Sequence, residues 1–246
     1  MNLFKHRQFK EDIIIWAVRW YCKYGISYRE LEEMLEERGV EIDHSTLNRW
    51  VIFYAPKLAQ KLKKYWKLTS NKTWYVDETY IKVKGKFTYL YRAVNKQGET
   101  IDFYLSPSRD SASAEHFLRK SLENLKQWQK PKTINTDKNS TYNVAIKNLK
   151  EKGEMPNSVL HRKVKYLNNR IESDHGKLKR LTKPTLGFKS LATGRATIAG
   201  FEVMRMFKKG QFKEVQTVRQ EIDLVTRSLS VCWRRGLLEA EGKRLG

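Results

Sequence analysis

Residues 73–83 read TWYVDETYIKV, a run of aromatic and β-branched side chains that is typical of a β-strand. Two runs of the same kind follow, FTYLYRAVN at 87–95 and TIDFYLSPS at 100–108. The connections between them, residues 84–86 and 96–99, are short and each contains a glycine. Such connections join antiparallel strands, so we expect the three runs to form an antiparallel meander.

The chain after the meander alternates between helix and strand signals. Apolar residues at helical spacing predict a helix from Ser113 to about Leu125, and Thr133 to Thr136 predicts a short strand. A second helix is expected from about Asn143 to Lys152, and VKYL at 164–167 predicts a last strand. Ser190 can cap a helix towards the end of the chain. This order of elements is that of an α/β domain.

The stretch YLNNRIESDHGKLKR at 166–180 carries many chemically usable side chains. A helix from Asn169 places Glu172, His175 and Lys179 at spacings of three and four, and therefore on one face. Gly176 interrupts this helix at a cost of about 1 kcal/mol relative to alanine. Taken alone, the stretch fits a solvated amphipathic helix better than a functional site.

The amino-terminal part predicts three helices. The first runs from Phe9 to Tyr24, Ser27 can cap the second, and Ser45 can cap the third. Two short helices joined through a glycine turn suggest a helix-turn-helix. The inner face of the first helix is expected to consist of Phe9, Ile13, Ala17, Trp20 and Tyr24.

The third helix is expected to point Thr46, Asn48 and Arg49 outward. These side chains can reach base edges or phosphates, as a recognition helix requires. An ordinary three-helix cap with no role in nucleic-acid binding is the alternative. The basic stretch 57–67 that follows predicts a linker helix.

The charge balance favours a polyanionic partner. The 246 residues include 49 lysines and arginines against 27 acidic residues, which gives a net charge of +22. Nucleic acid ranks first as the partner and an anionic membrane surface well behind it, because the basic residues are spread along the whole chain.

The two cysteines, Cys22 and Cys232, exclude a disulfide framework and a multi-cysteine zinc site. The first residues are too charged for a signal peptide, and the sequence lacks a run of the ~18 apolar residues of a membrane span. We therefore expect a cytoplasmic protein without a membrane partner.

Three carboxylates form a candidate metal site. Asp77 lies in the middle of an apolar strand, where a charge is costly unless it is paired or binds metal. Asp137 follows a predicted strand, at the end where α/β sheets place functional groups, and Glu172 lies on the predicted helix. Three oxygen ligands without cysteine suit a hard cation such as Mg²⁺, and two such ions can support phosphodiester exchange.

Each carboxylate taken singly is better explained as a cap or a salt-bridge partner. Glu78 and Asp174 are the nearest competitors, but strand and helix geometry is expected to point them away from Asp77 and Glu172. The spacing of the histidines matches no familiar zinc pattern. His175 can orient Glu172 or contact a phosphate, although a packing role explains it almost as well.

Several motifs, taken in order, resemble the bacterial insertion-sequence-six family of transposases, from about Leu3 to Gln211. The motifs are ISYRELEEMLEERG, HSTLNRW, VDETYIKVKGKFTYLYRAVNKQGETIDFYLS, NTDKN, VKYLNNRIESDH and GFKSLATGRATIAGFE. Gly176 and Asn48 depart from the family pattern, and the chain from about Lys213 on matches nothing known to us.

The resemblance implies an α/β fold, a ribonuclease-H-like mixed sheet flanked by helices, behind an all-α helix-turn-helix domain. It places the helix-turn-helix domain with its linker at residues 1–68, the catalytic domain at 69–211, and a tail of unknown role at 212–246.

The resemblance also implies an acidic triad of Asp77, Asp137 and Glu172 that binds Mg²⁺, for which Mn²⁺ can substitute. Lys179, with Arg180 and His175 beside it, is expected to contact DNA. The enzyme would cut element ends, join them to target DNA through cointegrates, and work as a homodimer or larger oligomer in the bacterial nucleoid. The alternatives are a repressor without enzymatic activity, an inactive relic, and a structure-specific nuclease on the same fold.

Overall fold

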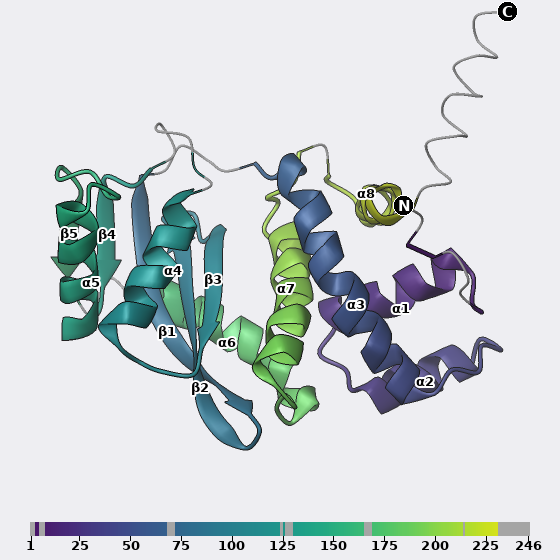
Figure 1. Ribbon diagram of the computed structural model, residues 1–246. Coiled ribbons are helices and arrows are strands. Elements are labelled where there is room, and N and C mark those ends of the chain that lie inside the picture. Colours follow the sequence, from purple (N-terminus) through teal and green to yellow (C-terminus); the bar gives the residue numbers. More distant parts are fainter. Residues whose placement is uncertain are drawn as a thin grey trace, which may run out of the picture. The chain divides into compact units, whose positions relative to one another are not determined.

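The computed structural model describes residues 3–4, 8–67, 72–123, 125, 130–164, 169–213 and 215–230. These residues form two compact units (Figure 1). The first unit contains the described residues up to Trp66 together with those from Ala196 onward, and the second runs from Lys67 to Arg195. The compact units meet after residues 66 and 195. The boundaries expected from the sequence, after residues 68 and 211, concern functional domains and stay a prediction.

The second unit is built on a five-stranded sheet with the strand order β3-β2-β1-β4-β5. Neighbouring strands of the β1–β2–β3 meander are antiparallel, whereas β4 is parallel to β1 and β5 is parallel to β4. This mixed sheet confirms the predicted meander and the predicted ribonuclease-H-like fold. The strands are β1 Thr73–Val83, β2 Lys86–Asn95, β3 Thr100–Ser106, β4 Thr133–Thr136 and β5 Leu160–Lys163.

Helices cover both faces of this sheet, and residues of β1 alternate between the two faces. Trp74 and Val76 pack in the core beneath α4 and α5, which contribute Phe117 and Ala145. Tyr75 faces the other side and packs against Ile171 of α6. The helices are α4 Ser111–Glu123, α5 Ser140–Glu151 and α6 Asn169–Thr182.

The first unit contains α1 Glu11–Lys23, α2 Tyr28–Glu36, α3 His44–Leu62 and α8 Val218–Leu229, together with the part of α7 (Leu191–Lys208) from Ala196 onward. Ser27 caps α2 in a capping box with Glu30, as its position predicted. Ser190 caps α7, accepting a hydrogen bond from the Thr193 backbone N–H at 3.1 Å. The third helix differs from the prediction, because Asp43 and not Ser45 is its cap.

Two other expectations were wrong. The last strand is Leu160–Lys163, and Val164, where we expected it to begin, lies outside a strand; residues 165–167 lie outside the described residues. This strand carries polar, largely exposed side chains at the sheet edge, so it lacks the apolar pattern used to predict it. The buried face of α1 is rotated from the predicted one: Ile14, Val18 and Tyr21 are buried and Tyr24 is exposed.

The part of the chain after residue 212, for which the sequence predicted no role, contributes to the first unit. Glu221 of α8 is buried and accepts hydrogen bonds from Arg19 Nε at 2.8 Å and Lys23 Nζ at 2.6 Å. This contact fastens α8 to α1. In the part of the chain that the structure describes, every helix is too short or too polar to cross a membrane.

Candidate active site

Three elements of the second unit carry the predicted acidic triad. Asp77 lies on β1 two residues after Tyr75, and therefore on the sheet face that α6 covers. Asp137 follows β4, which pairs with β1 in parallel through Tyr75 and Asn135. Glu172 lies in the first turn of α6. The fold thus brings residues that are 95 positions apart in the sequence to one side of the sheet.

Burial and neighbouring negative charges act together on Asp77. Burial is the main cause that raises the pKa of Asp77 to about 7, followed by the negative charges of Glu78, Asp137 and Glu172. A carboxylate that is surrounded in this way is unfavourable unless a cation offsets the charge. The site therefore has the oxygen-only donor set and the accumulated negative charge that suit a hard divalent cation.

The three carboxylates nevertheless form an open set. Among the described residues, a group of three such ligand atoms all within 4.8 Å of one another occurs only at Glu32, Asp43 and His44, in the first unit. Asp77 and Asp137 keep some exposure to solvent, with 17% and 33% of their side chains accessible, and Glu172 is exposed. An ion or substrate can thus reach all three.

Glu78, the first competitor for the site, is engaged elsewhere. It points to the opposite face from Asp77, and its Oε1 accepts a hydrogen bond from Arg109 Nε. Its Oε2 accepts a hydrogen bond from the Tyr142 hydroxyl at 2.6 Å. Because Glu78 is buried and both of its oxygens accept hydrogen bonds, we interpret it as a structural residue that holds Arg109 and Tyr142 together.

Asp174, the second competitor, is paired as well. Its Oδ2 lies 2.6 Å from Arg92 Nη2, and both residues are buried. Arg92 lies directly opposite Asp77 on the neighbouring strand β2. The pair therefore attaches α6, the helix that carries Glu172, to the sheet beside Asp77. Asp174 is buried whereas Glu172 is exposed, so the two side chains of α6 point in different directions as expected.

The other predicted residues of α6 occupy different environments. His175 is buried, with 6% of its surface exposed, and its Nδ1 lies 3.9 Å from Asp77 Oδ2. This placement suits orienting Asp77 better than contacting a phosphate. Lys179 and Arg180 are exposed in the last turn of the helix.

Sequence reasoning missed Arg109. It lies between β3 and α4, bonded to Glu78, with its Nη2 4.0 Å from Asp137 Oδ2. The only signal in the sequence was a single arginine in a polar loop, SPSRDS. Its partners lie 31 and 28 positions away, and spacing alone does not indicate such pairs.

The predicted recognition residues lie at the start of α3. Arg49 is exposed and its Nη2 donates a hydrogen bond to Thr46 Oγ1 at 2.9 Å. Asn48 is only partly exposed, and its side chain lies against the hydroxyl of Tyr28, whose pKa burial raises to about 12. Arg49 is therefore exposed as predicted, whereas Thr46 and Asn48 are only partly exposed.

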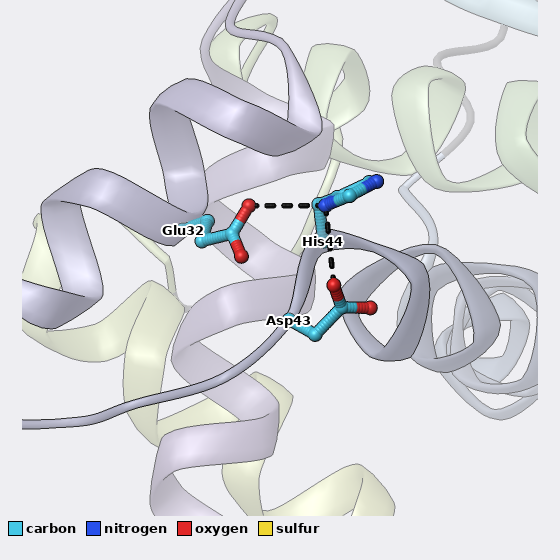
Figure 2. Close-up of side chains that lie close together, drawn as sticks. All are labelled: Glu32, Asp43 and His44. Carbon is cyan, nitrogen blue, oxygen red and sulfur yellow. Dashed lines mark hydrogen bonds and ion pairs between the residues drawn. The ribbon is translucent and has the colours of Figure 1, made fainter.

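An ion-pair cluster joins α2 to the start of α3 (Figure 2). His44 Nδ1 lies 3.1 Å from Glu32 Oε2 and 3.3 Å from Asp43 Oδ2. Asp43 also caps α3 by accepting a hydrogen bond from the Ser45 backbone N–H at 2.8 Å. The three side chains are partly exposed, and both carboxylates pair with His44. We therefore infer that they hold the start of α3 against α2.

Comparison with known proteins shows the family relationships of the chain. A family model described as a DDE domain matches residues 71–211. The transposase for the insertion sequence-like element IS431mec of Staphylococcus aureus is 42% identical over 217 residues, which cover 86% of this chain and 91% of that protein. The transposase for the insertion sequence element IS257 in transposon Tn4003 of Staphylococcus aureus matches to the same extent.

Among solved structures, the catalytic core domain of HTLV-2 integrase, determined in complex with magnesium, aligns with a TM-score of 0.41 and 19% identity. The alignment covers 53% of this chain and 82% of that one.

The matched DDE domain defines a class of enzymes, the DDE transposases of insertion sequences. Within that class, the chain belongs to the insertion-sequence-six family.

Proposed function

We propose that this transposase binds the terminal inverted repeats of its element and cuts and joins DNA strands at a divalent-metal site held by Asp77, Asp137 and Glu172. The single observation that carries the proposal is the environment of Asp77. It is a largely buried carboxylate whose charge is opposed by two further carboxylates from other elements. Such a cluster is costly without a cation, and clusters of this kind mark functional sites.

The residues of the second unit have separate roles in this proposal. Asp77, Asp137 and Glu172 hold Mg²⁺, and Mn²⁺ can substitute because it also accepts oxygen ligands. Bound ions of this kind activate the attacking oxygen and stabilise the leaving oxygen of a phosphodiester. His175 orients Asp77, and Lys179 and Arg180 attract the DNA backbone to the exposed side of α6.

The first unit supplies recognition of the element ends through α3. Arg49, placed by Thr46, is the residue that we expect to contact a base or a phosphate. Double-stranded DNA, as element ends and as target, is the partner that a net charge of +22 favours. We further propose that the protein acts as a dimer or larger oligomer at the nucleoid and moves its element replicatively, through cointegrates.

The test of the proposed function is a strand cleavage and joining assay. The protein is incubated with Mg²⁺ and DNA that carries the inverted repeats flanking its gene. Asp77→Asn, Asp137→Asn and Glu172→Gln should each abolish cleavage and joining while leaving binding to the repeats largely intact. The three effects should not add, because a metal site fails as a unit.

Glu151→Gln, a change at an exposed glutamate of α5, is the matched control and should act like the parent. Joining at the parental rate by Glu172→Gln would exclude Glu172 from the site. Cutting without joining would favour a structure-specific nuclease. Binding without cutting would favour a repressor or an inactive relic.

A separate binding assay tests recognition. Arg49→Ala should weaken binding to the repeats by about 1–3 kcal/mol if Arg49 contacts a base. Equal losses on repeat DNA and on random DNA would reduce Arg49 to a phosphate contact.

A further inference from the structure

Arg109 places a positive charge at the edge of the candidate active site. Its Nη2 lies 4.0 Å from Asp137 Oδ2, which is within ion-pair range but too long for a hydrogen bond. Its Nε donates to the buried carboxylate of Glu78. The guanidinium thus lies between the buried Glu78 and the partly exposed Asp137.

Glu78 and Tyr142 hold Arg109 in place from behind. The Tyr142 hydroxyl is buried and donates to Glu78 Oε2 at 2.6 Å, so the carboxylate cannot turn freely. A guanidinium bonded through Nε to such an anchor has a fixed plane. Holding the group in advance reduces the ordering cost when a ligand binds.

The exposure of Arg109 distinguishes it from an arginine that serves packing alone. Arg92, which pairs with Asp174 behind the same site, has 0% of its side chain exposed. Arg109 keeps 37% exposed although its partner Glu78 is buried. A charge that only neutralised Glu78 would not need to reach solvent beside Asp137.

We propose that Arg109 binds a phosphate of the DNA strand that is cut, next to Asp137, with Glu78 and Tyr142 as its positioning residues. A planar guanidinium with several N–H donors suits phosphate oxygens, and it can serve Glu78 through one edge and the phosphate through another. This contact would offset the repulsion between the backbone and the acidic triad. The inference rests on the proposed function, because it takes the triad as the cleavage site.

A binding cycle tests the contact without depending on catalysis. The probe is a labelled duplex of the flanking inverted repeat, in which one phosphate of the cleaved strand at a time is replaced by an uncharged methylphosphonate. The replacements cover the junction phosphate and its neighbours on both sides. Affinities of the full-length parent and of Arg109→Gln are measured in metal-free buffer, where the strand stays intact.

Arg109→Gln should weaken binding to unmodified DNA by about ten- to a hundredfold, as expected for loss of a charge-assisted hydrogen bond. At one methylphosphonate position the parent and the variant should bind within about twofold of each other, because the partner of Arg109 is already gone. Arg119→Gln is the matched control, since Arg119 is a partly exposed arginine paired with Glu115 and Glu154. Its effect should be the same on every probe.

Equal losses at all positions, or no loss, would overturn the proposal. If Arg109→Gln fails to fold because Glu78 loses its partner, the Glu78→Gln, Arg109→Gln double variant removes both charges and must give the same position-specific result. Arg109→Lys should lose less than Arg109→Gln. A parent protein that cuts and joins the repeats while the cycle shows no special position would reject this inference and leave the proposed function standing. A parent protein that neither cuts nor joins the repeats would reject the proposed function itself.

Discussion

Burial and neighbouring carboxylates disfavour the charged form of Asp77. Its pKa of about 7 lies above the ordinary value of 3.8, so the metal-free folded protein holds this proton more tightly than the unfolded chain does. The contribution of Asp77 to stability should therefore be greatest below about pH 4, be lost as the pH rises to 7, and level off above it. The pKa difference corresponds to about 2–4 kcal/mol, allowing for the remaining exposure of the side chain.

Asp77→Asn should remove this loss. We expect the metal-free variant to be more stable than the parent at pH 8 and its stability to depend less on pH, as measured by urea unfolding over a pH series. Glu151→Gln again serves as the control and should follow the parent curve. A variant that is less stable than the parent at pH 8 would show that a partner in the protein already offsets the charge of Asp77.

Mg²⁺ should change the order of these stabilities. An ion that binds only the folded state raises its stability, and the gain grows with the ion concentration. The melting temperature of the parent should rise with Mg²⁺, whereas Asp77→Asn, Asp137→Asn and Glu172→Gln should respond much less. An equal rise in all four proteins would place the ion elsewhere.

At the scale of single elements, α6 contains a glycine that the fold does not require. A Cβ added at Gly176 would meet nothing within 4 Å, whereas one added at Gly200 of α7 would lie 2.5 Å from Cys22 Sγ and 2.8 Å from Ala55 Cβ. Gly176→Ala should therefore stabilise the protein by about 0.5–1 kcal/mol. Gly200→Ala should destabilise it by about 1–3 kcal/mol through overpacking.

Chemical unfolding measures both changes, and the joining assay accompanies it. A Gly176→Ala protein that folds normally but no longer joins strands would indicate that α6 approaches DNA closely at this turn. The glycine would then be functional, and the departure from the family pattern at this position would have a reason.

A buried ion pair between Arg92 and Asp174 links α6 to β2. Arg92→Met would leave Asp174 as a buried charge without this partner, at a cost of about 3–5 kcal/mol. Adding Asp174→Leu should recover much of that loss, because an apolar pair of similar volume often replaces a buried ion pair without penalty. Urea unfolding of the single and double variants decides the matter, and a single variant that costs less than about 1 kcal/mol would show that the pair does not hold the helix.

Sequence patterns predicted the elements that have strong local signals. The strand β1 was predicted to the residue because its aromatic and β-branched side chains mark it, and α2 because its capping box does. The strand β5 escaped prediction because an edge strand with exposed polar side chains has no apolar pattern. The buried face of α1 was misjudged because two stripes of the helix carry apolar residues at the same period.

The proposed triad rests on single residues in unusual places, such as a carboxylate inside an apolar strand. The arginines near it could not be inferred in this way. Nothing in the local sequence distinguishes Arg92 and Arg109 from arginines on the surface. Only the packing of distant elements shows that Arg92 is buried and that Arg109 reaches Asp137. Electrostatic partners of a site are long-range features, and local spacing does not encode them.

For the whole molecule, the two units differ in how the chain builds them. The second unit is one continuous stretch, whereas the first combines the beginning of the chain with residues from Ala196 onward. One of the contacts that join the two parts of the first unit is ionic: Glu221 of α8 binds Arg19 and Lys23 of α1, and all three residues are buried. The stability of α1 to α3 should therefore depend on Glu221, which lies far beyond them in the chain.

Glu221→Gln tests this dependence. The change leaves two buried cations without their counter-charge, which should destabilise the first unit by about 3–5 kcal/mol. Hydrogen exchange should show faster exchange of the α1 and α3 amides and unchanged exchange of the β1 and β2 amides. Binding to the inverted repeats should fall while the Mg²⁺-induced stabilisation of the second unit persists. Asp223→Asn, at an exposed position of the same helix, is the control. Equal acceleration of exchange in α1 and in β1 would mean that the two units unfold as one, and the separate stability of the first unit would have to be abandoned.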